Sequence, residues 1–242
     1  MTETEKNKRF TKGIIKNRED LTNDLWKIWI EPEEKFNFDP GQYCTVGYNN
    51  IERPYSIVSS PDEDLIELFV ELVPEPLGNL TPLLYELNIG SEITLRKKPK
   101  GIFKFQSQFK NHIMVSTVTG VAPFVSMIRS IDFKKTDYNI WIFEGASYID
   151  EFGYLNELTS ISEKNEKVDF TPTCSRPNDP KNVAWKGKTG RVNEIFNSIY
   201  NLEKADKENT IIYACGHPDM VTYVAEKYSN KFNFIEEKFW KL

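Results

Sequence analysis

Hydrophobic and polar residues alternate along much of the first half of the chain. Within residues 65–72, the side chains of Ile66, Leu68 and Val70 fall on one side and that of Glu67 falls on the other. A period of two residues is that of a half-buried strand. At least six such short strands predict a small antiparallel barrel. The other strands are expected at residues 11–16, 26–31, 42–48, 55–59 and 92–95.

A helix interrupts this series before its last strand. Thr81 is expected as the N-cap, and Pro82 suits the first helical position because the N–H that proline lacks would be unpaired there. Gly90 closes the segment.

The pattern changes near residues 106–110, after which buried apolar strands alternate with helices. This alternation predicts a five-stranded parallel sheet covered by helices on both faces, whose ligands collect at the carboxyl ends of the strands. We therefore expect a flexible N-terminal arm at residues 1–9, a β-barrel domain at 10–107 and an α/β domain at 108–242. The expected strands are 112–118, 138–143, 168–173, 211–214 and 232–235, and the expected helices are 122–131, 154–161, 192–200 and 218–228.

Composition excludes several classes of protein. The 242 residues are 39% hydrophobic and 28% charged, which is typical of a soluble globular chain. A net charge of -5 argues against general binding to nucleic acid or to an anionic membrane. The three cysteines, Cys44, Cys174 and Cys215, are too few for a disulfide framework or a four-thiolate iron–sulfur cluster. No apolar run approaches the roughly 20 residues that span a bilayer, so we expect a cytoplasmic protein.

The first candidate site is the tetrad Arg53-Pro54-Tyr55-Ser56. Arg53 and Tyr55 project to the same face of a strand, so one can bind a phosphate while the other covers a flat heterocycle. Ser56 points the other way, but its hydroxyl or backbone amide could still meet a ring nitrogen. The alternative is an exposed arginine beside a tyrosine that covers the barrel mouth.

Three turns are further candidates. Residues 78–82, Gly-Asn-Leu-Thr-Pro, combine a flexible turn with a helix N-terminus that could hold an anion, although an ordinary cap explains Thr81 equally well. Residues 116–123, Ser-Thr-Val-Thr-Gly-Val-Ala-Pro, lead from the first parallel strand into a helix, where a pyrophosphate could rest; tight packing is the alternative. This turn has neither the G-x-G-x-x-G fingerprint nor a phosphate-binding P-loop.

The last turn is Cys215-Gly216-His217-Pro218-Asp219, at the carboxyl end of another parallel strand. Its thiol would face the same edge of the sheet as the turn at residues 116–123. A zinc site lacks the required ligand spacing, and a Cys/His nucleophile lacks an orienting acid. We expect no metal.

Together, and in this order, the four segments resemble the ferredoxin-NADP reductase family, especially its compact bacterial members. The resemblance runs from about Lys12 to Trp240, and its most specific motifs are the R-x-Y-S tetrad and the C-G-x-P turn. It implies non-covalent FAD between two domains. Arg53 would bind the FAD pyrophosphate, Tyr55 would stack on the isoalloxazine, and Ser56 would bond near flavin N5. Further phosphate contacts are implied for Gly78, Asn79, Leu80 and Thr81.

The resemblance also implies that the dinucleotide cosubstrate is NADPH, which donates a hydride to flavin N5. Cys215 would approach C4 of the nicotinamide. The other implied contacts are Thr119, Gly120, Val121, Pro123, Gly216 and Pro218. Family members often carry glycine at the position of Val118, so the dinucleotide could approach this turn less closely here.

The choice of NADPH over NADH depends on positive charge near the ribose 2'-phosphate. Arg176 and Arg191 resemble the residues of that pocket, whereas Ser147 stands where some relatives carry another arginine. Either arginine could instead be a solvated surface residue. At the C-terminus, Phe239 or Trp240 would cover the flavin or its adenine, with core packing as the alternative, and Glu237 is a candidate proton donor.

Because the chain cannot ligate an iron–sulfur cluster, electrons must pass to a separate carrier, either a ferredoxin or a flavodoxin. The basic stretch at residues 96–104 could dock such an acidic protein, or it could be a solubilising loop. The expected protein is thus a monomeric ferredoxin/flavodoxin-NADP+ oxidoreductase. The nearer alternative is an NADH-dependent reductase component of an oxygenase or other acceptor system, and the more distant one is a non-catalytic two-domain binding module.

Overall fold

The structure is a computed structural model that describes residues 9–199, 202 and 205–239. Nearly all of the predicted arm at residues 1–9, and Trp240, lie outside the described residues. By its contacts the chain divides into two compact units: residues up to 105 together with 122–130, and residues 106–121 together with 131 onwards. No helix in the described part of the chain combines the length and the apolar character that crossing a bilayer demands.

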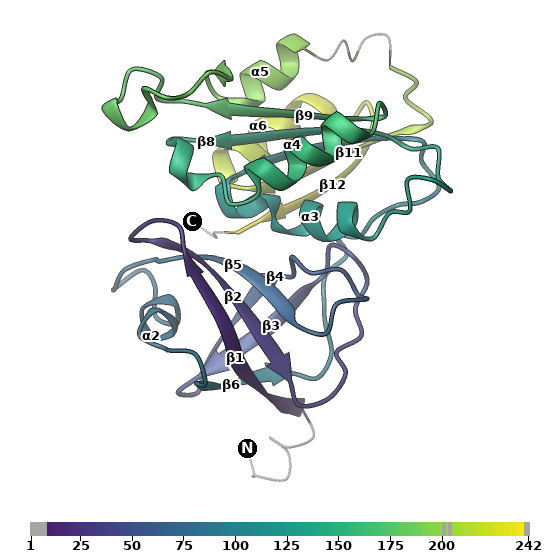
Figure 1. The fold of residues 1–242 in the computed structure, drawn as a ribbon. Helices are drawn as coiled ribbons and strands as arrows, with labels where there is room; N and C mark the ends of the chain where they lie inside the picture. Colours follow the sequence, from purple (N-terminus) through teal and green to yellow (C-terminus); the bar gives the residue numbers. More distant parts are fainter. Residues whose placement is uncertain (1–8, 200–201, 203–204, 240–242) are drawn as a thin grey trace. The chain divides into compact units, whose positions relative to one another are not determined.

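The first unit contains a six-stranded antiparallel sheet in the order β4-β3-β6-β1-β2-β5 (Figure 1). An isolated bridge between Ile57, just after β4, and Leu68 of β5 joins the two edges and nearly closes the barrel. This confirms the predicted barrel. The strands are β1 (Phe10–Asp20), β2 (Leu25–Pro32), β3 (Tyr43–Tyr48), β4 (Ile51–Ser56), β5 (Ile66–Glu71) and β6 (Glu92–Arg96).

The apolar side chains of the alternating strands fill the interior of the barrel. Ile28 and Ile30 of β2 and Leu68 and Val70 of β5 are almost completely buried in one hydrophobic cluster. The inward face expected for residues 65–72 is therefore confirmed, but the opposite face of β5 is not exposed to solvent, because Phe69 is only 4% exposed. Glu67 was expected on the outer face, yet it is only 2% exposed.

Helix α2 (Thr81–Tyr85) is shorter than expected and begins differently. Thr81 is not the N-cap: that position belongs to Leu80, whose side chain makes no capping bond. The Thr81 hydroxyl instead accepts from the N–H of Val73 and donates to its carbonyl, at 3.0 Å each. The hydroxyl closes the loop in front of the helix, so it cannot cap the helix itself. Pro82 lies in the first turn, but as the second residue of the helix rather than the first as predicted.

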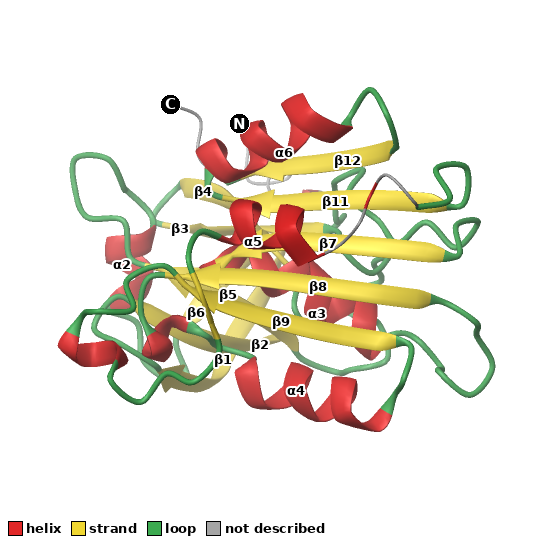
Figure 2. Ribbon diagram, turned by 90° about the horizontal axis from the view of Figure 1, so that it is seen from above, coloured by secondary structure: helices red, strands yellow, loops and turns green. Residues whose placement is uncertain are grey.

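The second unit is a parallel sheet in the order β10-β9-β8-β7-β11-β12. Five longer strands follow the prediction, and a two-residue strand at the edge adds a sixth. Helix α4 lies on one face of this sheet and helices α5 and α6 on the other (Figure 2). The elements are β7 (Asn111–Thr117), β8 (Asn139–Ala146), α4 (Leu155–Lys164), β9 (Val168–Cys174), β10 (Lys188–Thr189), α5 (Val192–Ile199), β11 (Thr210–Gly216), α6 (Pro218–Tyr228) and β12 (Asn233–Lys238).

The two faces of the parallel sheet differ in chemistry. Val115, Phe143 and Ala214 point toward the cluster that contains side chains of α5 and α6. The residues that follow them along the strands are Ser116, Glu144 and Cys215, which are register neighbours on the opposite face. Polar groups therefore gather on one face, near the carboxyl ends of the central strands.

Helix α3 (Ala122–Arg129) comes directly after β7 and the 3-10 turn Val118–Val121. By its contacts it groups with the barrel. The ring of Phe124 lies 5.7 Å from that of Phe103, which follows the last barrel strand. The chain thus returns to the first unit for one helix before it completes the second.

Candidate functional site

The Arg53–Ser56 tetrad ends strand β4. Tyr55 is the register partner of Cys44 on β3, and Arg53 is the partner of Val46, so both side chains belong to one face as expected. The Arg53 guanidinium is exposed, and its Nη1 donates to the carbonyl of Glu52 at 2.7 Å. Within the described residues Arg53 forms no ion pair with a carboxylate. Its charge is therefore available to an anion.

Tyr55 is half-buried and packs against the hydrophobic core of the barrel. Burial raises the pKa of its phenol well above the ordinary value, although the charge of Arg53 opposes the shift. The ring is thus a neutral, flat surface that the barrel holds on one side. Ser56 is 7% exposed and follows on the opposite face of the strand.

The loop at residues 73–81 is closed tightly on itself. The N–H of Gly78 donates to the carbonyl of Pro74 at 2.9 Å. A Cβ at Gly78 would stand 1.8 Å from the carbonyl oxygen of Val73, so any side chain would disrupt the loop. The requirement for glycine here therefore follows from the loop itself. Asn79 is exposed and Leu80 is buried.

In the second unit, the structure brings together the two turns that follow β7 and β11. The hydroxyl of Thr117 accepts from the N–H of His217 at 2.8 Å. A Cβ on Gly120 would lie 2.3 Å from the carbonyl oxygen of Cys215, and a Cβ on Gly216 would lie 2.4 Å from Thr117 Oγ1. Both glycines are therefore needed for the two backbones to approach. Two segments 100 residues apart in sequence form one surface at the carboxyl edge of the sheet.

Val118 lies in a conformation that valine rarely adopts. Its φ of +42° is in the left-handed region, where a β-branched side chain crowds the backbone. Glycine would adopt this φ without strain. Valine at a position where family members often carry glycine therefore strains the backbone of the turn between β7 and α3.

Cys215 is fully buried, and burial, followed by the charge of Glu237, raises the pKa of its thiol well above the ordinary value. The thiol is therefore neutral near pH 7 rather than a nucleophilic thiolate. Glu237 is its register neighbour on β12. His217 and Pro218 begin helix α6: the His217 ring accepts from the N–H of Asp219 at 3.2 Å, and Pro218 takes the first turn.

Glu144 is a polar residue of this region that the sequence pattern did not single out. It is 0% exposed, and neither carboxylate oxygen has a hydrogen-bond partner within the described residues. Burial raises its pKa to about 8. Its register neighbour on β7 is Ser116, which in turn neighbours Cys215. A glutamate inside the otherwise apolar run of residues 140–146 was the signal that could have revealed it.

The loops after β8 and β9 carry the cations expected near a 2'-phosphate. The guanidinium of Arg176 donates to the hydroxyl of Tyr148 and lies 5.0 Å from the centre of its ring. Lys181 reaches the same ring, with Nζ 4.7 Å from the centre. Buried Asn182 joins the loops, because its Nδ2 donates to the carbonyls of Ser147 and Arg176. Sequence reasoning missed Tyr148, Lys181 and Asn182, which no local motif marks.

Arg191 belongs to the same edge of the sheet. Thr189 of β10 pairs in parallel with Cys174 of β9, so Arg191 and Arg176 each lie two residues beyond a paired position. Arg191 is exposed and makes no ion pair within the described residues. Ser147 is half-buried, and its N–H donates to Glu151 at 2.7 Å.

The described part of the tail ends at Phe239. Its N–H donates to the carbonyl of Gly216 at 3.3 Å, so the tail is attached to the Cys215 turn. Trp240 lies outside the described residues, and its expected role over the flavin stays a prediction. Within the part of the chain that is described, no three His, Cys, Asp or Glu side chains are grouped as metal ligands.

Comparisons with known proteins agree with this arrangement. Residues 114–226 match the family model described as the oxidoreductase NAD-binding domain. This range contains the two turns that follow β7 and β11, and the loop that carries Arg176. A flavodoxin/ferredoxin--NADP reductase of Buchnera aphidicola is 28% identical over 193 residues, which are 76% of each chain. Protein RfbI of Salmonella typhimurium is 30% identical over 196 residues, or 81% of this chain. This chain spans only 56% of the length of that relative.

A solved structure shares the whole fold. The crystal structure of a ferredoxin NADP+ reductase from Neisseria gonorrhoeae, with bound FAD and NADP, has a TM-score of 0.82 with this chain. It is 24% identical and covers 96% of this chain and 99% of its own. This chain therefore has the fold of that reductase and, over 76% of its length, is similar in sequence to a flavodoxin/ferredoxin--NADP reductase, as its motifs predict.

Proposed function

We propose that this protein is a flavoenzyme that moves electrons between NADPH and a separate one-electron carrier, a ferredoxin or a flavodoxin. The observation that carries the proposal is the joined surface of the Thr117–Gly120 and Cys215–Gly216 turns. Two glycines there allow close backbone approach, and a neutral thiol lies at the end of the strand. Such a surface at the carboxyl edge of a parallel sheet suits a dinucleotide.

The residues of the barrel fit FAD. The guanidinium of Arg53, which forms no ion pair with a described carboxylate, suits a pyrophosphate, because guanidinium binds phosphate oxygens bidentately. The ring of Tyr55, which packs against the barrel core, suits a flat tricycle. Ser56 follows on the opposite face of the strand, and its hydroxyl or backbone amide would bond to a ring nitrogen. When bound, FAD would supply the acceptor for the hydride and release electrons one at a time. The further phosphate contacts at residues 78–81 stay a prediction.

The residues of the second unit would bind and orient NADPH. The turn at residues 119–123 would hold the pyrophosphate, and Cys215 would place an uncharged contact beside the nicotinamide. Glu237, the neighbour of Cys215, is the candidate for holding a proton near the reacting ring. Phe239 would continue this surface along the tail, since its backbone is bonded to Gly216.

A spectrum and an anaerobic titration test the proposal. The purified protein should be yellow with bound FAD, and NADPH should bleach the flavin absorbance. Replacing Arg53 by Ala should weaken FAD binding at least tenfold, whereas Lys16→Ala, which removes an exposed cation of the same barrel, should leave it unchanged. A colourless protein that takes up no added FAD would refute the proposal and favour a non-catalytic binding module.

The cations around Tyr148 support NADPH over NADH. A 2'-phosphate carries negative charge that Arg176, Lys181 and Arg191 could neutralise. Arg176→Ala and Arg191→Ala should therefore raise the KM for NADPH about tenfold or more and leave the KM for NADH nearly unchanged. The matched control is Lys188→Ala, an exposed cation on the neighbouring strand β10.

The nearer alternative is an NADH-dependent reductase component, and Ser147 is the observation that favours it. This residue supplies no charge where some relatives carry an arginine. If both arginine variants change turnover with NADPH and NADH equally, the NADPH assignment is wrong and the alternative is preferred. The comparison uses the same protein and dye acceptor, so carrier binding does not affect it.

The basic stretch is the proposed docking surface for the carrier. Arg96, Lys97 and Lys104 pair with Glu52, Glu34 and Asp39, which reduces their free charge. Lys98 and Lys100 are exposed without an ion pair in the described chain, beside the 84%-exposed Ile102. Lys98→Glu with Lys100→Glu should thus weaken carrier reduction and its dependence on salt, while reduction of a small dye by NADPH stays unchanged. Equal carrier reduction by the variant would show that the stretch is only a solubilising loop.

A further inference from the structure

A buried amide joins the loops that follow β8 and β9. Asn182, at the end of the short 3-10 helix after β9, is only 2% exposed. Its Oδ1 accepts from the N–H of Ile149 at 2.9 Å. Its Nδ2 donates to the carbonyls of Ser147 at 2.9 Å and Arg176 at 2.8 Å. Three of the four hydrogen bonds that an amide can make are thus directed at the backbone of these two loops, and they fix one loop against the other.

The ring of Tyr148 holds two cations between those backbone contacts. The guanidinium of Arg176 donates to the Tyr148 hydroxyl, and its central carbon lies 5.0 Å from the centre of the ring. The Nζ of Lys181 lies 4.7 Å from the same centre. An aromatic face attracts a cation, so the ring offsets part of the repulsion between two like charges that share one place.

The backbone of the Tyr148 turn is already satisfied. One oxygen of Glu151, Oε2, accepts from the N–H of Ser147 at 2.7 Å and from the N–H of Tyr148 at 3.0 Å. Asp179 in turn accepts from the N–H of Lys181 at 2.9 Å. These N–H groups are therefore not available to a phosphate. Recognition of an anion at these loops falls to the side chains of Arg176 and Lys181.

The charge of this segment contrasts with that of the chain. Residues 175–191 contain three lysines and two arginines but a single acidic residue, Asp179, so their formal charge is +4, whereas the whole chain carries -5. A local excess of cations in an acidic protein favours an anionic ligand at that place. Among the described residues of this segment, Arg176 and Lys181 are the cations that an aromatic ring holds.

We propose that Asn182 and Tyr148 are positioning residues for the 2'-phosphate of NADPH, and that Lys181 is a specificity-determining residue. Asn182 fixes the two loops, and Tyr148 keeps both cations at one point before the ligand arrives. Cations that are already ordered lose less conformational entropy when they bind a phosphate. Lys181 supplies the charge that Ser147 does not. This inference rests on the proposed function.

Nucleotide binding tests the inference without electron transfer. Adenosine 2',5'-bisphosphate carries the 2'-phosphate and 5'-AMP lacks it, so the ratio of their Kd values, from isothermal titration calorimetry on the full chain, reports recognition of that group. The wild-type ratio should favour the bisphosphate at least tenfold. Lys181→Ala and Tyr148→Leu should each reduce the ratio about fivefold and leave the Kd for 5'-AMP within twofold of wild type. Lys181→Arg should restore the ratio, because it keeps the charge.

Two further variants separate the parts of the arrangement. Tyr148→Phe keeps the ring but removes the hydroxyl that accepts from Arg176, so it should reduce the ratio only about twofold. Asn182→Ala releases both loops and should reduce the ratio about fivefold. A merely structural role for these residues predicts less stable proteins in which the ratio stays at the wild-type value.

Lys186→Ala is the matched control. Lys186 is an exposed cation of the same segment, five residues after Lys181. Its removal takes away the same charge but leaves the Tyr148 ring and its two cations intact, so the ratio should stay within twofold of wild type. A loss as large as that in Lys181→Ala would show that total charge, rather than the held pair, selects the phosphate, and would overturn the proposal.

The remaining outcomes are also decisive. A wild-type ratio in Lys181→Ala or in Tyr148→Leu overturns the role given to that residue. If Asn182→Ala fails to fold, Asn182→Ser replaces it, and a wild-type ratio there overturns the role of Asn182. Equal binding of the two nucleotides by wild type refutes the choice of NADPH and the inference with it. The expected ratios in a chain that takes up no FAD would refute the flavoenzyme function alone and support the 2'-phosphate site.

Discussion

Two glutamates with the same degree of burial lie in opposite surroundings in the two units. Glu67, on a barrel strand, is 2% exposed and forms an ion pair with Arg129. Glu144, on a strand of the parallel sheet, is 0% exposed and has no hydrogen-bond partner within the described residues. Burial alone therefore does not decide what a carboxyl does. The two carboxyls differ in whether a cation lies within reach.

The difference in pairing between Glu67 and Glu144 suits the roles proposed for the barrel and for the parallel sheet. The barrel uses charge to fix a helix, where fixed donor directions matter. The strand ends of the parallel sheet keep their polar groups neutral instead: burial raises the pKa of Glu144 to about 8, and the Cys215 thiol is also neutral. Ser116 lies between these two in register. The row continues from Cys215 to Glu237 on β12, whose charge contributes to the raised pKa of the thiol.

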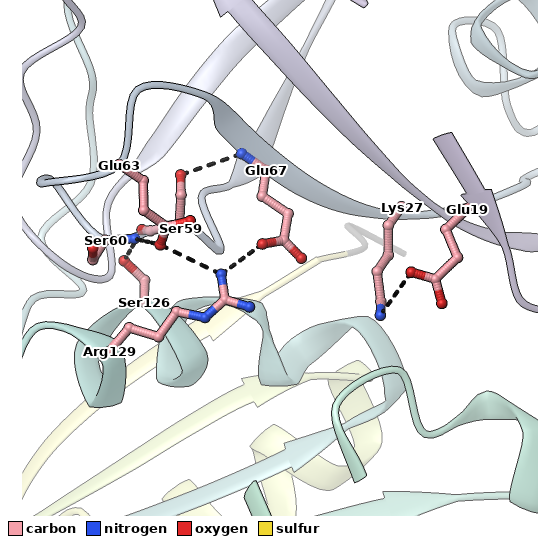
Figure 3. Close-up of polar contacts among 8 residues, drawn as sticks. All are labelled: Glu19, Lys27, Ser59, Ser60, Glu63, Glu67, Ser126 and Arg129. Carbon is pink, nitrogen blue, oxygen red and sulfur yellow. Dashed lines mark hydrogen bonds and ion pairs between the residues drawn. The ribbon is translucent and has the colours of Figure 1, made fainter. Parts of the chain in front are cut away.

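The largest effect is expected when Arg129, the cation that pairs with Glu67, is removed (Figure 3). Arg129→Met leaves the buried Glu67 carboxylate without its guanidinium and should lower the free energy of unfolding by about 3 kcal/mol. Urea denaturation at pH 7 measures the loss. Adding Glu67→Gln should restore part of the stability, because no buried charge then remains unpaired. A loss below about 0.5 kcal/mol would contradict the view that this pair is energetically coupled.

Next in size is the effect of the unpaired carboxyl, seen as pH dependence. The folded pKa of Glu144 is raised from 4.5 to about 8, so the folded state binds more protons than the unfolded state between these values. The stabilising contribution of the protonated group is therefore complete below about pH 4.5 and is lost as pH rises toward 8. Between pH 7 and 8 the loss should be about 1 kcal/mol.

Glu144→Gln, which mimics the protonated acid, should abolish that loss. Urea denaturation at pH 7 and 8 measures this change in the free energy of unfolding. If the variant loses as much stability as wild type between these pH values, Glu144 is already ionised in the folded protein. The window avoids His112, whose pKa burial lowers to about 4. His112 lowers the free energy of unfolding only as pH falls from about 6.5 toward 4, because its ring then binds protons more readily in the unfolded state.

The smallest expected effect concerns the strained turn. Val118→Gly relieves a left-handed backbone but adds freedom to the unfolded chain, so the net gain in stability should be about 0.5 kcal/mol. Thermal unfolding measures it, with Val121→Gly, at a buried neighbour whose φ is not positive, as the destabilising control. A destabilised Val118→Gly protein would show that the side chain contributes more in packing than its backbone costs.

Local patterns in the sequence were enough for most of the elements. Alternation placed β5 and its inward residues, and the strand–helix series placed the longer parallel strands, because these signals repeat within a few residues. The predictions failed where a side chain bonds outside its own element and where an element is very short. Thr81 has the residue type of an N-cap, but a bond to Val73 uses its hydroxyl. The two-residue β10 is too short to show a period.

The sequence by itself determined the element types, the two-part architecture and the chemistry of the four candidate segments. Only the tertiary structure decided which of these groups meet: Ser126 with Ser59 across 67 residues, and Thr117 with His217 across 100. It also decided that Glu67 is paired with Arg129, while Glu144 has no hydrogen-bond partner among the described residues. The physical reason is that backbone propensity and hydrophobic period are short-range, whereas pairing and burial depend on how distant segments pack.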